Sequence, residues 1–123
     1  MELALDRPED FLFIRRADAH AVTVVDRELT ASFILARDRA IEDWATTDIA
    51  KLMPQQLEPI LGLKPDVVLL GSGARQQFPS QAVLAAFLQR RIGVEVMDNA
   101  AAARTWNVLA GEGRNVVAAF ILS

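Results

Sequence analysis

Three strand-like segments in the second half of the chain alternate with two amphipathic stretches, and this alternation limits the fold more than any other feature. The segments read DVVLLGS, GVEVMD and NVVAAFIL. The first is a short continuous apolar run, which is typical of a strand that is covered on both faces, and the third reads as a buried strand as well. The connections between the segments are too long for hairpins, so the pattern predicts parallel strands joined by right-handed helical crossovers.

The two connecting stretches carry helix signals. Ser80 is the expected N-cap of the first helix. Its apolar face is expected to consist of Val83, Leu84, Phe87 and Leu88. Asn99 is the expected cap of the second helix, which runs through residues 100–109 and ends at Gly111.

The first half of the chain is richer in strand signals. A polar break at residues 26–28 predicts a hairpin between residues 20–25 and residues 30–36. Further on, Pro54 suits the first turn of a helix over residues 55–61.

These segments predict an α/β fold in a single domain over residues 1–123. A mixed β-sheet would hold a C-terminal β-α-β-α-β unit, and the N-terminal part would be β-rich. No linker, repeat or low-complexity run divides the chain.

Composition narrows the classes of function. The content of 52% hydrophobic and 24% charged residues is typical of a globular protein, and the net charge of −3 gives no support to nucleic acid as a general partner. The absence of cysteine removes thiolate metal sites and cysteine nucleophiles, and we expect neither a metal nor a cofactor. The start of the chain lacks the pattern of a secretory signal and no segment is long enough to span a bilayer, so a cytoplasmic protein with no integral membrane segment is expected.

Gly71, Ser72 and Gly73 follow the first apolar run and allow three interpretations. A dinucleotide loop is one, but Gln76 stands where that motif needs a third glycine. A hydrolase elbow with Ser72 as nucleophile is another, but its flanking glycines are misplaced and His20 is the only histidine. The third is structural: two glycines permit the backbone angles that turn the chain out of the sheet.

Charged and polar residues are expected to gather at the carboxyl edge of the sheet, where ligands bind in open α/β folds. Arg75 follows the first strand and Asp98 ends the second, while Arg104 and Asn107 lie in the next helix. Arginines there would hold a carboxylate or phosphate. The alternative is an internal pair of Arg75 with Asp98 that fixes the loops.

The sequence from residue 65 onward resembles the complex I assembly factor 3 family. The matching positions are Pro65, Asp66, Gly71, Gly73, Arg75, Pro79, Gly93, Val94, Asp98, Ala102, Thr105, Asn107, Glu112, Gly113 and Arg114, with Ser32 and Trp44 upstream. The resemblance implies a three-layer domain with a central mixed sheet, and a role in assembly. It implies no reaction, because none is established for that family.

Two functional hypotheses follow. The first is a non-catalytic module that binds a protein partner, with a homodimer as one way of presenting its surface. The second is a small-molecule site, for an anion or a nucleotide, at the strand-end crevice lined by Gly71, Ser72, Gly73, Arg75, Asp98, Arg104 and Asn107.

Overall fold

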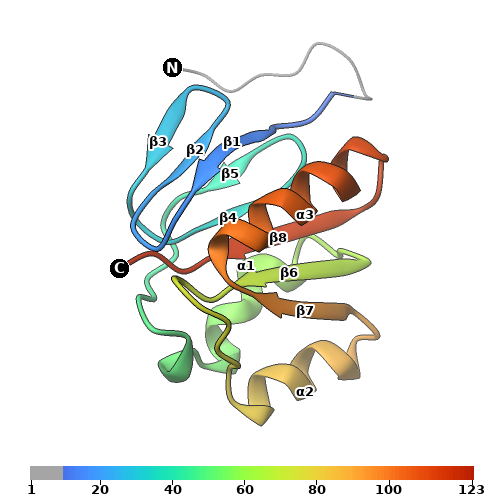
Figure 1. Ribbon diagram of the computed structural model, residues 1–123. Coiled ribbons are helices and arrows are strands. Elements are labelled where there is room, and N and C mark those ends of the chain that lie inside the picture. The colour runs from blue at the N-terminus through green and yellow to red at the C-terminus, as the bar shows by residue number, and fades with distance from the viewer. Residues whose placement is uncertain (1–9) are drawn as a thin grey trace.

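The computed structural model describes residues 10–123, and within them the strands form two sheets. The larger is a five-stranded mixed sheet (Figure 1). Its order is β5 (Ala40–Ile41), β4 (Phe33–Leu35), β8 (Val116–Phe120), β6 (Val67–Gly71) and β7 (Gly93–Met97). β6 pairs in parallel with both β7 and β8, while β4 is antiparallel to β8 and to β5. The expected parallel unit is therefore confirmed.

The positions of two helices follow from this strand order. α2 (Gln81–Gln89) connects β6 to β7, and α3 (Asn99–Gly111) connects β7 to β8 on the other side of β6. Right-handed crossovers that leave in opposite directions put their helices on opposite faces of a sheet. Figure 1 shows α3 and α2 in separate layers with β6 between them.

Alternation along the central strands divides the core into two clusters. Leu69, Ala118 and Phe120 pack with α3 and the smaller sheet, whereas Val68 and Leu70 pack with α2 and α1 (Glu58–Leu61). Strands with both faces buried explain why their sequence reads as unbroken apolar runs. The three-layer α/β architecture is thus observed.

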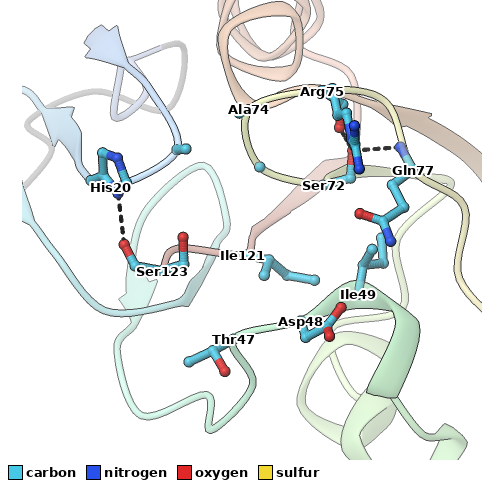
Figure 2. A pocket seen from close by; sticks show the side chains of 12 residues that line it. His20, Thr47, Asp48, Ile49, Ser72, Ala74, Arg75, Gln77, Ile121 and Ser123 are labelled. Carbon is cyan, nitrogen blue, oxygen red and sulfur yellow. Dashed lines mark hydrogen bonds between the residues drawn. The ribbon is translucent and has the colours of Figure 1, made fainter.

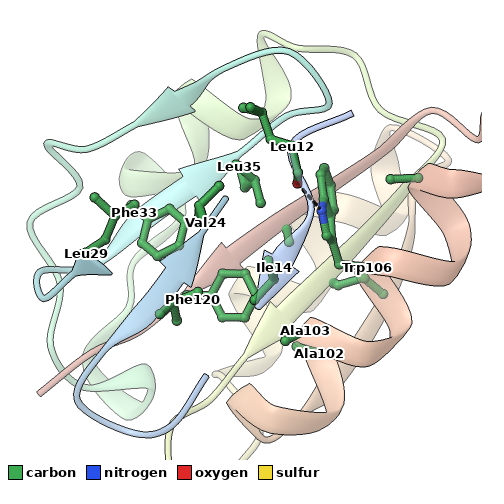
Figure 3. Packing of buried hydrophobic residues seen from close by; sticks show 14 of the residues in the cluster. Leu12, Ile14, Val24, Leu29, Phe33, Leu35, Ala102, Ala103, Trp106 and Phe120 are labelled. Carbon is green, nitrogen blue, oxygen red and sulfur yellow. Dashed lines mark hydrogen bonds between the residues drawn. The ribbon is translucent and has the colours of Figure 1, made fainter. Parts of the chain in front are cut away.

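The smaller sheet closes one face of the molecule. Over the described residues it is antiparallel in the order β1 (Ile14–Ala17), β2 (Val22–Val24) and β3 (Arg27–Leu29). Its buried side chains meet those of the mixed sheet and α3, where the rings of Phe33 and Phe120 stack with centroids 5.3 Å apart (Figure 3). The buried Trp106 indole donates a hydrogen bond of 2.8 Å to the Leu12 carbonyl.

The predicted hairpin between residues 20–25 and 30–36 is wrong. β2 pairs instead with β3, so that Arg27 and Glu28, which were predicted to lie in the turn, form part of a strand. Val25 takes a positive φ of 56° in the actual turn, a conformation that a β-branched residue seldom adopts and that no glycine signalled. Residues 33–35, fully buried, belong to the mixed sheet.

Three helix predictions change in detail. Pro54 does open a helical segment, but the structure forms a 3₁₀ helix, Pro54–Leu57, before α1. Leu88 is 77% exposed, because the face of α2 that meets the sheet is carried by Val83 and Phe87. The cap of α3 is Asp98 rather than Asn99.

Candidate functional site

Gly71 ends β6 at a place where no side chain fits. A Cβ atom on this residue would lie 2.5 Å from Asn99 Oδ1 and 3.0 Å from Phe120 Cδ1. Two residues later, Gly73 has a φ of +106°, which favours glycine. These observations support the structural interpretation of the glycine pair.

Asn99 is fully buried and joins three parts of the chain. Its Oδ1 accepts a hydrogen bond of 3.1 Å from the Gly73 main-chain amide, and its main-chain amide donates to the Gly73 carbonyl at 2.9 Å. Its Nδ2 donates to the carbonyls of Asp18 and Ile121, both at 3.0 Å. One side chain thus holds the loop after β6, the turn between β1 and β2, and the end of β8 together.

The hydroxyl of Ser72 is also used within the fold. The hydroxyl donates toward two main-chain carbonyls, that of Arg75 at 2.7 Å and that of Met97 at 3.1 Å, and its oxygen accepts the Gln77 amide at 3.1 Å. Among the described residues, no hydrogen bond joins Ser72 to His20. The hydrolase interpretation therefore has no base beside its nucleophile.

The loop between β6 and α2 keeps the helix away from the glycine turn. α2 begins at Gln81 with Ser80 as its cap, several residues after Gly73. At the position where a dinucleotide motif has its third glycine, Gln76 donates its side-chain amide to the Val96 carbonyl of β7 at 2.9 Å. This geometry gives a pyrophosphate no helix amides beside the turn.

A pocket of about 440 Å³ lies at the carboxyl ends of β6 and β8. Figure 2 shows it bordered by the loop that follows β6, by the turn that carries His20, and by the segment with Thr47 and Asp48. Its lining comprises Ala19, His20, Thr47, Asp48, Ile49, Ser72, Gly73, Ala74, Arg75, Gln77, Ile121 and Ser123. This edge of an open α/β sheet is where ligands commonly bind.

The polar groups around this pocket differ in how far they are engaged. His20 Nδ1 lies 2.8 Å from the main-chain oxygen of Ser123. The Asp48 carboxylate accepts the Ala50 amide at 2.9 Å and so caps the 3₁₀ helix Ile49–Lys51. The exposed Arg75 guanidinium makes no hydrogen bond or ion pair with any residue of the described part of the chain. Among the described residues that line the pocket, Arg75 therefore offers a cationic group for an anion.

The residues predicted to line one crevice do not lie together in the structure. Gly73, Ser72 and Arg75 line the strand-end pocket, whereas Arg104 and Asn107 line a second pocket between β1 and α3. Asp98 borders neither pocket, and its carboxylate accepts the Ala101 amide at 2.7 Å. The internal pair of Arg75 with Asp98 is absent from residues 10–123.

Asn107 is engaged with the backbone of the smaller sheet. Its Oδ1 accepts the Ile14 amide and its Nδ2 donates to the Ile14 carbonyl, each at 2.8 Å. The side chain thus takes the place of a neighbouring strand at the edge of β1, which accounts for an asparagine inside a helix.

Asp18 organises the turn that leads to His20. Its carboxylate accepts the amides of His20 and Ala21 at 2.8 and 2.9 Å. These two hydrogen bonds lower the pKa of Asp18 below its ordinary value, and the positive charges of His20 and Arg16 add to the effect.

Sequence reasoning missed several residues of this region. His20, Thr47 and Asp48 reach the pocket from segments whose place in the fold the sequence pattern leaves open. Two threonines precede Asp48, and Asp48 caps a 3₁₀ helix in the structure. This run of capping residues is the signal in the sequence that a polar loop ends there. For Asn99, the sequence pattern indicates only a helix cap.

Comparison with known proteins places the chain in a family. Residues 14–121 match the family model described as "Protein of unknown function (DUF498/DUF598)". The chain belongs to the DUF498/DUF598 family. Its fold recurs in a Xanthomonas campestris protein solved by NMR, with 48% identity, coverage of 99% of this chain and 92% of that chain, and a TM-score of 0.85.

Other relatives of this DUF498/DUF598 domain extend the comparison. A Bordetella pertussis protein described as a Mth938-like domain has 25% identity, covers 98% of this chain and 92% of its own, and gives a TM-score of 0.75. A Francisella tularensis protein named "13 kDa major membrane protein" is 30% identical over 69 residues, which is 56% of either chain. The match thus spans little more than half of that relative's length.

The lengths of the helices bear on whether the chain could cross a membrane. Of the helices within residues 10–123, none combines the length and the apolar character that crossing a bilayer requires. The cytoplasmic location of this DUF498/DUF598 member stays a prediction.

Proposed function

We propose that this chain is a non-catalytic module that binds a partner protein, in an assembly role of the kind that its resemblance to the complex I assembly factor 3 family suggests. The observation that carries the proposal is how the polar side chains after β6 and in α3 are engaged. The side chains of Ser72, Asn99 and Asn107 all form hydrogen bonds with backbone partners within the fold. Groups held in this way stabilise a surface rather than perform chemistry on a substrate.

The loop between β6 and α2 supplies the surface that we assign to the partner. Phe78 is 60% exposed there, and Arg75 is exposed three residues earlier. Aromatic residues and arginine dominate the binding energy of protein interfaces. A complementary partner would offer an apolar pocket to Phe78 and a carboxylate to Arg75.

The test is affinity capture from the native cell with matched variants. The double variant Arg75→Ala/Phe78→Ala should lose a stoichiometric partner that the wild-type chain recovers. Leu88→Ala, which removes a still more exposed side chain from α2, should retain it. Recovery of the same partner by the loop variant, or of the bare wild-type protein under gentle conditions, would overturn the proposal. Light scattering on the purified chain reports whether it forms a homodimer.

A small-molecule site is the second candidate, and the strand-end pocket favours it. The pocket offers the Arg75 guanidinium and a volume of about 440 Å³, which lies within the usual range for ligand sites. A thermal-shift screen with nucleotides, phosphorylated metabolites and carboxylates tests this function. Stabilisation by an anion that disappears in Arg75→Ala but persists in Phe78→Ala would favour it over protein docking.

A further inference from the structure

A second pocket, of about 300 Å³, lies between β1 and α3 on a different part of the surface from the strand-end pocket. Its charged lining consists of Arg15 and Arg16 from β1 and Arg104 from α3. The short side chains of Ala17, Ala100 and Ala103 border the remaining space. The lining of this open volume thus includes three arginines.

The charge of this lining sets it apart from neighbouring pockets. Within residues 10–123 no acidic residue lines it, whereas the strand-end pocket contains Asp48 and the pocket near Arg27 contains Glu28 and Glu42. Arg27 is moreover neutralised by Glu42 at 2.6 Å. The positive charge of this lining is opposite in sign to the net charge of −3 of the chain, so it is a local feature of this surface.

The three arginines have different local contacts. Arg15 donates to the Val25 carbonyl and lies over the Phe13 ring, 5.3 Å from its centroid, which orients its guanidinium. Arg16 lies near Asp18 closely enough to contribute to that residue's lowered pKa. Arg104 is exposed and makes no hydrogen bond or ion pair within residues 10–123. Two of the three groups therefore retain most of their donors for a ligand.

The remaining polar group cannot compete for such a ligand. Both ends of the Asn107 amide are bonded to Ile14. Asp98 already occupies the N-terminal cap of α3, so attraction to this pocket rests on the arginines rather than on helix amides. Among the described residues, the lining side chains thus offer hydrogen-bond donors and no free acceptor, which favours a ligand that accepts hydrogen bonds.

We infer that the pocket between β1 and α3 binds a phosphate group, carried by a soluble phosphoester or by a phospholipid headgroup. Guanidinium forks match the geometry of phosphate oxygens. Three positive charges around one small volume complement a multiply charged phosphate better than a single carboxylate. The site is independent of the partner surface formed by Arg75 and Phe78.

The experiment uses the full chain and two probes. Calorimetry measures binding of inorganic pyrophosphate, and sedimentation measures binding to phosphatidylcholine vesicles with and without phosphatidylglycerol. The variant Arg16→Gln/Arg104→Gln removes two charges from the pocket and leaves Arg15 in its contacts. The matched control, Arg90→Gln/Arg91→Gln, removes the same charge from the exposed end of α2.

The pocket variant should weaken binding of at least one probe by about tenfold or more while the control keeps wild-type affinity. Binding of pyrophosphate identifies a soluble phosphoester as the source, and binding of phosphatidylglycerol vesicles alone identifies a headgroup. Failure of the wild-type chain to bind either probe, or equal weakening by both variants, overturns the inference. Circular dichroism verifies the fold, and the single variant Arg104→Gln carries the same readout if the double variant unfolds.

Discussion

Asn99 Oδ1 occupies the space that a side chain on Gly71 would need, with only 2.5 Å between that oxygen and the position of a Cβ atom. The same oxygen accepts the Gly73 amide. The absence of a side chain at the end of β6 is therefore a condition for the hydrogen bonds that hold the strand-end loop.

Gly71→Ala should destabilise the protein. The added methyl group meets Asn99 Oδ1 and the Phe120 ring, and neither is the free end of a flexible side chain. We expect the free energy of unfolding to fall by about 1–3 kcal/mol in urea denaturation. Gly93→Ala is the control, because its nearest contact would be at 3.7 Å. Equal stability of the two variants would contradict the steric argument.

Asn99→Ala should interact with the Gly71 substitution. Alone it leaves the Gly73 amide and the carbonyls of Asp18 and Ile121 without their partner, so we expect a loss of about 3 kcal/mol or more. In the presence of Asn99→Ala the obstructing oxygen is gone, so Gly71→Ala should cost about 1 kcal/mol less than in the wild type. A double-mutant cycle measures this difference. Strict additivity would contradict a direct contact.

Acidification should remove the contribution of Asp18 to stability. Its pKa is lower in the folded state than the ordinary value of 3.8, chiefly because its carboxylate accepts the amides of His20 and Ala21. The contribution is complete above the unfolded-state pKa and is lost as pH falls through the lower folded-state pKa. Urea denaturation at stepped pH below 3.8 should show a shallower loss for Asp18→Asn than for the wild type. Parallel profiles would contradict this assignment.

Asn107→Ala should loosen β1 from α3. The substitution removes both hydrogen bonds to Ile14 and should lower the free energy of unfolding by about 2 kcal/mol. Hydrogen exchange at the Ile14 amide should become faster. Arg104→Gln, on the same helix but without a bond to β1 in the described residues, should leave that exchange unchanged. Unchanged protection in Asn107→Ala would show that another contact holds the strand.

The sequence predicts the parallel half of the fold well because its signals are local. β6 and β8 each coincide with an apolar run, β7 coincides with the predicted segment GVEVMD, and Ser80 caps α2 as expected. The hairpin was harder to predict because its turn uses Val25 with a positive φ, and because Glu28 faces solvent in a strand of a one-sided sheet. Local polarity there resembles that of a loop.

The candidate site depends on strand order, which local patterns do not encode. With β6 between β7 and β8, the chain after α3 returns to the far side of β6. Arg104 and Asn107 consequently face β1 instead of Arg75. The contribution of His20 to the strand-end pocket likewise requires the tie between Asn99 and the turn at Asp18, a contact across 81 positions of sequence.

The hydrogen bond from Gln76 to β7 affects the tendency of the protein to associate with copies of itself. β7 is an outer strand of the mixed sheet, and the Gln76 amide covers its Val96 carbonyl. An exposed edge strand can form hydrogen bonds with a strand of another molecule, and such pairing leads to fibrils and precipitates. A strand from another molecule would have to displace the Gln76 side chain before it could pair with β7 at Val96. The loop that leads into α2 therefore also opposes polymerisation through this edge.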